Sequence, residues 1–240
     1  MLAFVFLSIL IVILLFASAI ESTSLEGSSA VESKLCICVG DSITFGVGAS
    51  EPSITSYPAV LSRVLEERGL NYTVLNYGVK SATLQKHNPI SFWSTREYKA
   101  SIQHRNADSV ILLFGANDAK YQYGWNESVF ISDYADLVQS YRAAGASRVF
   151  LMTPTVLLPW YASTKVNATL INGELPGLVR SLAARLGCGL VDAFGSLGGS
   201  GLTVTKHCIQ YFVRDGLHPN DKGYEQIARA ALDAVTAASP

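Results

Sequence analysis

The fold of this chain is decided by residues 35–46, Leu-Cys-Ile-Cys-Val-Gly-Asp-Ser-Ile-Thr-Phe-Gly. The first five of these residues are apolar and predict a buried strand, which runs straight into a Gly-Asp-Ser turn. Further apolar runs, each bounded by polar or glycine residues, predict strands at 72–77, 109–114 and 148–152 and the start of a short fifth strand at 190–191. Stretches with helical periodicity separate these runs. The alternation predicts an α/β fold in which helices cover both faces of a parallel sheet.

Composition limits the class of protein. The chain has 240 residues, its 18 Lys+Arg against 19 Asp+Glu give a formal net charge of −1, and 49% of the residues are hydrophobic. A chain this apolar is not intrinsically disordered, and without a basic excess we expect no nucleic-acid partner. The sequence contains no internal repeat and no sign of a second domain. We therefore predict one globular domain over residues 34–240.

The N-terminus resembles an export signal. Residues 2–16 are apolar except for one serine, and the small residues Ala-Ser-Ala at 17–19 are typical of a signal-peptide cleavage site. We predict a signal peptide at 1–19, a linker at 20–33 and a secreted, extracellular protein. The alternative is an uncleaved membrane anchor, because the segment 2–20 is close to the length of about 20 residues that spans a bilayer. Only in that case do we expect the protein to meet a membrane.

Export predicts two further features, N-glycans and disulfides. Acceptor triplets for N-glycans begin at Asn71, Asn126 and Asn167. Cys36 and Cys38 lie two apart on one predicted strand and are unsuited to bridge each other, so Cys188 with Cys208 is the first disulfide to consider. Four free, buried thiols are the equal alternative. No cysteine spacing resembles a zinc site.

Two short motifs supply the residue types that nucleophilic catalysis needs. Ser42 follows the first strand, and Asp215 and His218 lie three apart just before the last amphipathic segment. A serine needs a base, and the base needs a group that orients it, so His218 would take the proton of Ser42 while Asp215 holds the other imidazole nitrogen. Each motif read alone also fits a helix cap. The other histidines are scattered, so we predict no metal site and no cofactor.

Acyl transfer also needs hydrogen-bond donors for the oxyanion that forms on the substrate carbonyl. The third strand ends in Gly-Ala-Asn-Asp, where the side-chain amide of Asn117 can point over the sheet edge. The second strand ends near Gly78, where a backbone N–H can approach the substrate closely. The backbone N–H of Ser42 makes a third candidate donor. Taken singly, Gly78 and Asn117 are also ordinary turn residues.

Together, the four motifs resemble the SGNH hydrolases, the GDSL esterase and lipase family, over nearly all of residues 35–235. The matching positions are Ser42 in Gly-Asp-Ser-Ile-Thr, Gly78 in Asn-Tyr-Gly-Val-Lys-Ser-Ala-Thr, Asn117 in Gly-Ala-Asn-Asp, and Asp215 and His218 in Asp-Gly-Leu-His-Pro. The second block departs from the family pattern, because Ser81 replaces its usual second glycine.

The resemblance implies a three-layer α/β/α, flavodoxin-like fold with a five-stranded parallel sheet and no metal. It implies that Ser42 is the nucleophile, that His218 is general base and then acid, and that Asp215 orients the imidazole. Ser42, Gly78 and Asn117 would form the oxyanion hole. The reaction would pass through an acyl-enzyme that water resolves, and its rate would rise through a single ionisation near that of histidine.

The sequence indicates the substrate less directly. The loop residues Trp93, Trp125 and Trp160 could stack on sugar rings, and we count them, with Asp41 beside the serine, as candidates for substrate contact. The segments around Trp93 and Asn117 are similar to the sialate O-acetylesterase-like branch, which implies removal of acetyl groups from a glycan or another small hydroxylated substrate. The alternatives are a lipase or lysophospholipase and an acyltransferase with the same serine apparatus. A glycan-binding domain without activity would have lost a catalytic position, and this chain keeps all of them.

Overall fold

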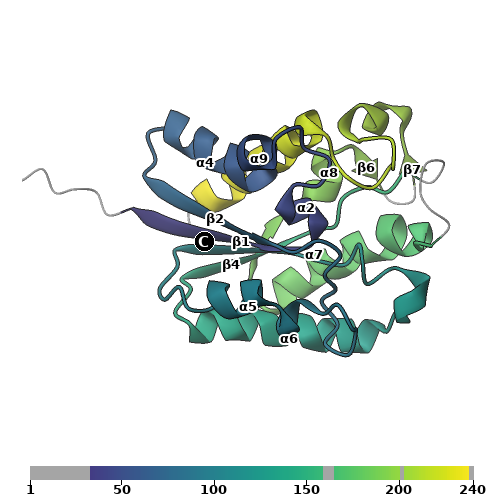
Figure 1. Cartoon of the computed structure of the whole chain (residues 1–240), viewed down its shortest axis with the longest axis horizontal. Helices are drawn as coiled ribbons and strands as arrows, with labels where there is room; N and C mark the ends of the chain where they lie inside the picture. The colour runs from purple at the N-terminus through teal and green to yellow at the C-terminus, as the bar shows by residue number, and fades with distance from the viewer. Residues whose placement is uncertain (1–32, 159–164, 201–202, 238–240) are drawn as a thin grey trace, which may run out of the picture. The chain divides into compact units, whose positions relative to one another are not determined.

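The strand predicted at residues 35–39 lies within a five-stranded parallel sheet (Figure 1). A computed structural model describes residues 33–158, 165–200 and 203–237, which belong to one structural unit. The sheet has the order β2-β1-β3-β4-β5, and every pairing in it is parallel. Its strands are β1 (Lys34–Gly40), β2 (Tyr72–Gly78), β3 (Ser109–Leu113), β4 (Arg148–Met152) and β5 (Gly189–Val191).

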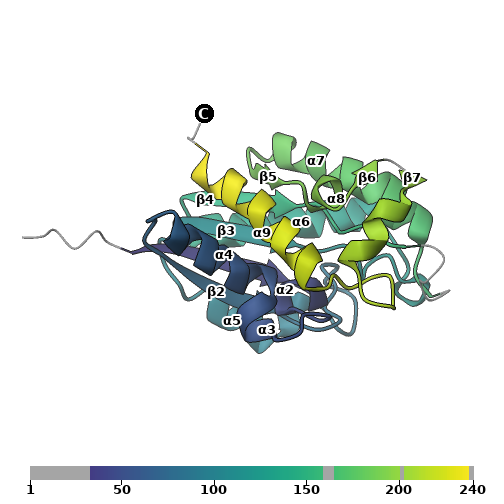
Figure 2. The same cartoon turned by 90° about the horizontal axis from the view of Figure 1, so that it is seen from above.

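Helices cover both faces of this sheet, as Figures 1 and 2 show. One face carries α4 (Tyr57–Glu67) and α9 (Asp221–Thr236), and the other carries α5 (Arg96–Ser101), α6 (Glu127–Ala143) and α7 (Leu175–Arg185). The predicted three-layer α/β/α fold is therefore confirmed.

Shorter elements connect these layers, and most of them follow the carboxyl ends of strands. The short helices are α2 (Ser42–Phe45), α3 (Pro52–Thr55), α8 (Ala193–Ser196), η1 (Phe92–Ser94), η2 (Tyr121–Tyr123), η3 (Leu170–Glu174) and η4 (Lys206–Tyr211). A small antiparallel pair, β6 (Gly199–Ser200) with β7 (Thr203–Val204), was not predicted from the sequence.

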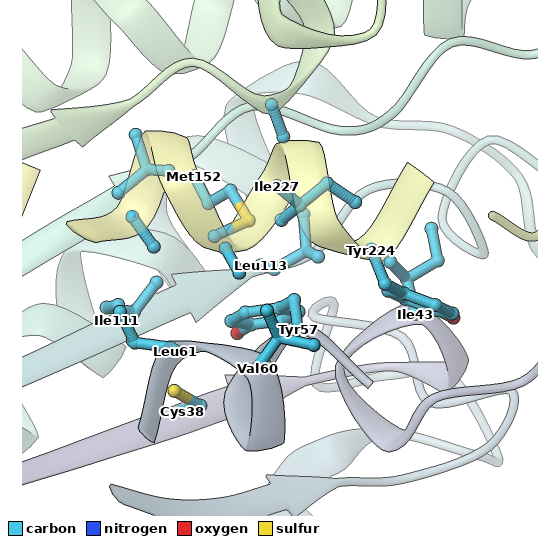
Figure 3. Packing of buried hydrophobic residues seen from close by; sticks show 14 of the residues in the cluster. Cys38, Ile43, Tyr57, Val60, Leu61, Ile111, Leu113, Met152, Tyr224 and Ile227 are labelled. Atoms are coloured by element: carbon cyan, nitrogen blue, oxygen red, sulfur yellow. The ribbon is translucent and has the colours of Figure 1, made fainter. Parts of the chain in front are cut away.

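Alternate residues of the strands β1, β3 and β4 pack into two separate cores. Cys36 and Cys38 of β1 are buried on the α4 and α9 face, whereas Ile37 and Val39 are buried on the α6 and α7 face. Successive side chains of a strand point to opposite faces, and a parallel sheet covered on both faces is apolar at every position. Figure 3 shows the first core, where residues of α4 and α9 such as Tyr57 and Ile227 pack over the sheet.

The disulfide considered first is not formed, because all four cysteines are free. Cys208 is buried in the core under α4 and α9, while Cys188 packs against the core on the opposite face of the sheet. The sheet therefore separates the two thiols. The alternative of four free thiols is correct, although Cys188 is only partly buried.

The predicted signal peptide at 1–19, nearly all of the predicted linker at 20–33, and Trp160 lie outside the described residues. Within residues 33–158, 165–200 and 203–237, no helix is long and apolar enough to cross a bilayer.

Candidate active site

The serine of the Gly-Asp-Ser turn is the first residue of α2, directly beyond the carboxyl end of β1. Asp41 caps this helix, because its Oδ1 accepts the Ile43 N–H at 2.9 Å. Gly40 is required before the turn, since a Cβ at this position would clash with Thr44 Oγ1 and the carbonyl oxygen of Leu113. The backbone N–H of Ser42 has no acceptor within the described residues, as expected at the first position of a helix.

Ser42, His218 and Asp215 form one hydrogen-bonded chain. Ser42 Oγ lies 2.9 Å from His218 Nε2, and His218 Nδ1 lies 2.5 Å from Asp215 Oδ2. The other carboxylate oxygen of Asp215 accepts the backbone N–H groups of Leu217 and His218, both at 2.9 Å. Partial burial raises the pKa of Asp215, but these hydrogen bonds outweigh burial and lower it to about 2. A proton on Nδ1 therefore leaves Nε2 free to accept the hydroxyl proton of Ser42.

Hydrogen bonds to Asp221, whose role the sequence analysis did not identify, connect the segments that carry Ser42 and His218. Asp221 is the first residue of α9 and accepts hydrogen bonds from the Ser50 N–H at 2.8 Å, the Ser50 hydroxyl at 2.6 Å and the Thr55 hydroxyl at 2.9 Å. The Tyr224 hydroxyl of the same helix donates to the carbonyl of Val47 at 2.6 Å. These bonds tie the loop that follows the serine helix to the helix that follows His218.

Asn117 follows the end of β3, and its side chain lies against Asp41, the residue before Ser42. Its side chain is buried, and its amide nitrogen Nδ2 donates to Asp41 Oδ2 at 3.3 Å and to the carbonyl oxygen of Ala82 at 3.1 Å. Asp41 immediately precedes Ser42, so the structure brings the ends of β1 and β3 and the loop after β2 together.

Gly78 does not offer a free donor, which corrects the sequence analysis. Its N–H donates to Asn76 Oδ1 at 2.9 Å, and the amide nitrogen of Asn76 donates to the Thr44 carbonyl at 2.8 Å. A Cβ at Gly78 would clash with the backbone of Phe45. The glycine is therefore needed for the close packing of β2 against α2.

Ser81 occupies the turn that follows, where the family pattern has a glycine. Its φ of 65° lies in the left-handed region that glycine adopts readily and other residues adopt rarely. Its N–H donates no hydrogen bond within the described residues. Ala82, the next residue, supplies the carbonyl that holds Asn117.

The model of the GDSL-like lipase/acylhydrolase family matches residues 38–226, and this segment includes Ser42, Asn117, Asp215 and His218. The chain belongs to the GDSL-like lipase/acylhydrolase family. The predicted resemblance to the SGNH and GDSL enzymes is therefore confirmed.

One sequence relative and two solved structures illustrate what this chain is similar to. An acetylxylan esterase of Xylanibacter ruminicola is 26% identical over 219 residues, which cover 82% of this chain and 42% of that enzyme, so this chain spans less than half of its length. A lipase/acylhydrolase from Enterococcus faecalis superposes with a TM-score of 0.66 at 21% identity, over 83% of this chain and 93% of that one. A carbohydrate acetylesterase family member from Sinorhizobium meliloti superposes with a TM-score of 0.65 at 19% identity, over 84% of this chain and 97% of that one.

Two of the three candidate tryptophans of the GDSL domain are packed as loop anchors. The indole N–H of Trp93 donates to the Leu84 carbonyl at 3.0 Å, and its ring contacts Tyr98. The ring of Trp125 lies 4.9 Å, centroid to centroid, from that of the buried Phe130. These contacts explain both side chains without a substrate.

Other aromatic side chains are more exposed and follow the catalytic segments directly. Phe45 ends α2 and is 37% exposed, with Lys80 Nζ 4.4 Å from its ring centre. Tyr121 begins η2, four residues after Asn117, and is 64% exposed. Sequence reasoning missed both, although their spacing from Ser42 and Asn117 was available as a signal.

Asp41 is not placed to contact substrate, because it is 1% exposed and both carboxylate oxygens are occupied within the protein. Burial raises the pKa of Asp41 to about 7, against the opposing effects of the Ile43 hydrogen bond and the charge of His218. Burial also raises the pKa of the neighbouring Asp118 to about 6, although Asp118 accepts the backbone N–H groups of Leu84 and Gln85.

These carboxyl groups predict how stability depends on pH. Asp215 has a folded pKa of about 2 against 3.8 when unfolded, so its stabilisation is present above about pH 4 and is lost as pH falls through 2. Asp41 and Asp118 have raised folded pKa values, so their contribution is lost as pH rises through about 6 to 7. We expect the melting temperature to be highest near about pH 4 to 5 and to decline toward pH 8. Calorimetry of the wild type and Asp41→Asn would check this, and an equally steep decline in the variant would contradict it.

Proposed function

We propose that this GDSL hydrolase removes acetyl groups from a carbohydrate by way of an acyl-enzyme on Ser42. The observation that carries the proposal is the chain from Ser42 Oγ through His218 to Asp215, with links of 2.9 and 2.5 Å. The sequence relative named an acetylxylan esterase supports a carbohydrate ester as substrate.

In this mechanism Ser42 Oγ attacks the ester carbonyl while its proton passes to His218 Nε2, and Asp215 stabilises the imidazolium that results. The tetrahedral intermediate collapses when His218 returns that proton to the leaving sugar hydroxyl, which leaves an acetyl group on Ser42. A water then loses a proton to His218 and attacks the acetyl carbonyl. Acetate departs and Ser42 recovers its proton, so the enzyme ends unchanged.

The oxyanion would receive hydrogen bonds from the backbone N–H of Ser42 and the amide of Asn117. As the third donor we propose the backbone N–H of Ser81 and no longer that of Gly78. The Gly78 N–H is hydrogen-bonded to Asn76, whereas the Ser81 N–H donates no hydrogen bond within the described residues. Donors fixed before the reaction stabilise developing charge most strongly, which suits groups held by turns and buried hydrogen bonds.

Phe45 and Tyr121 are the side chains we propose for stacking on a sugar ring, in place of Trp93 and Trp125. They are exposed, and they follow Ser42 and Asn117 within four residues. Trp160 remains a candidate. Secretion, with a signal peptide at 1–19 and N-glycans at Asn71, Asn126 and Asn167, also remains a prediction.

Kinetics on a substrate panel test the proposal. We expect kcat/KM to be highest for p-nitrophenyl acetate, lower for the butyrate and lowest for the laurate, and we expect release of acetate from an acetylated xylo-oligosaccharide or from O-acetyl sialic acid. Replacing Tyr121 by alanine should raise KM for the oligosaccharide and leave that for p-nitrophenyl acetate unchanged. A preference for laurate or a phospholipid would favour a lipase, and acetyl transfer to an added alcohol in preference to water would favour a transferase.

A further inference from the structure

Asp41 holds two different parts of the site. One carboxylate oxygen accepts the Ile43 N–H at 2.9 Å and thereby caps the helix that begins with Ser42. The other accepts the amide of Asn117 at 3.3 Å. The carboxylate is buried, and among the described residues these two donors are its hydrogen-bond partners.

Each hydrogen of the Asn117 amide has an acceptor within the protein. An amide nitrogen carries two hydrogens, and here one faces Asp41 Oδ2 and the other faces the Ala82 carbonyl, 3.1 Å away. These two acceptors fix the direction of the amide. A substrate oxyanion must share one of the two hydrogens, and the bond to Asp41 is the longer of the two.

We propose that Asp41 is a positioning residue that holds the Asn117 amide in its oxyanion-binding orientation only while the carboxyl group is ionised, so that hydrolysis requires both Asp41 and His218 to be deprotonated. The proposal rests on the proposed function, in which Asn117 binds the oxyanion. Because Oδ1 accepts the Ile43 N–H, a proton on Asp41 would sit on Oδ2, where it would face the Asn117 donor. Two donors would then oppose each other, and the amide would lose its orientation.

The surroundings of Asp41 set the pH at which its carboxyl group becomes protonated. The titratable groups that face it are His218, Asp118, Lys120, Tyr134 and Tyr224, from the loops after β3 and before α9 and from α6 and α9. Burial dominates and raises the pKa of Asp41 to about 7, and the charges of His218 and Lys120 lower it while that of Asp118 raises it. Burial itself lowers the pKa of Lys120, which is half-buried. Asp41 would therefore titrate in the range where esterases are assayed.

The slope of the acid limb of log(kcat/KM) against pH tests the proposal. For wild-type protein and p-nitrophenyl acetate between about pH 5 and 8 we expect a limiting slope of about two, because two groups must lose a proton. Asp41→Asn should reduce the slope to about one and lower the plateau by no more than the loss of Asn117 does. Asp118→Asn, which neutralises the neighbouring buried carboxyl group, should keep a slope of about two.

Lys120→Met gives a second readout that leaves the network intact. Removing this cation should shift the acid limb to higher pH, because the pKa of Asp41 rises, and Lys120→Arg should restore the wild-type position. An unshifted limb in Lys120→Met, or a slope of one in an active wild type, would overturn the proposal.

A double-mutant cycle separates positioning from a general effect on the fold. Asn117→Ala should lower kcat by about 10² to 10³-fold, and adding Asp41→Asn to it should lower kcat by less than about threefold further. Additive losses would overturn the proposal, because Asp41 would then act independently of Asn117. Failure of the proposed function would look different, since wild-type protein would then not hydrolyse acetyl esters at all.

Discussion

Replacing Ser42 by alanine is expected to lower kcat for p-nitrophenyl acetate by about 10⁶-fold. The change removes the oxygen that we propose attacks the carbonyl, and no other hydroxyl is hydrogen-bonded to His218 within the described residues. Residual hydrolysis should reflect only the oxyanion donors and substrate binding. Single-turnover and steady-state kinetics, with mass spectrometry of the quenched reaction, would show the loss of the acetylated enzyme.

The fold should tolerate this change. Within the part of the chain that the structure describes, Ser42 Oγ makes one hydrogen bond, to His218, while the cap of α2 comes from the side chain of Asp41. We therefore expect the melting temperature of Ser42→Ala to stay close to that of the wild type. An acetyl group found on another residue, with activity retained, would show that Ser42 is not the nucleophile.

Replacing His218 by alanine is expected to have an effect of similar size, about 10⁶-fold in kcat. Without the imidazole, the hydroxyl of Ser42 has no base at 2.9 Å, and the leaving alcohol has no acid. Steady-state kinetics on p-nitrophenyl acetate would measure the loss. A fluorophosphonate probe should also label Ser42 far more slowly in this variant.

His207 provides the matched control. It is exposed on η4 and hydrogen-bonds the Gln210 side chain, and among the described residues it shares no hydrogen bond with Ser42, His218 or Asp215. His207→Ala should keep the wild-type kcat. Equal losses in His207→Ala and His218→Ala would indicate a general effect of removing a histidine and would contradict the assignment of the base.

The sheet was the most predictable part of the molecule. Apolar runs at 35–39, 72–77, 109–114 and 148–152 correspond to β1 to β4 within one residue at each end. The signal is strongest in β1, β3 and β4, which are covered on both faces and almost entirely buried, whereas β2 is a partly exposed edge strand. The β6 and β7 pair and η4 were not predicted, since segments of two to six residues carry too little periodicity to detect.

Parts of the site were beyond the reach of sequence because they depend on where single atoms point. Gly78 was a reasonable donor by position, but the Asn76 side chain folds back onto its N–H. Trp93 and Trp125 lie on loops, yet their rings turn inward to Tyr98 and Phe130. The role of Asp41 was hidden for the same reason: its link to Asn117 joins residues 76 positions apart.

The hydrogen bonds of Asp221 have a consequence for the entropy of substrate binding in the proposed reaction. Ser42 and His218 are 176 residues apart in the chain, and the hydrogen bonds of Asp221 and Tyr224 hold their two loops together. The conformational freedom of the proposed nucleophile and base is therefore lost during folding, and none of that entropy would have to be removed again in each turnover.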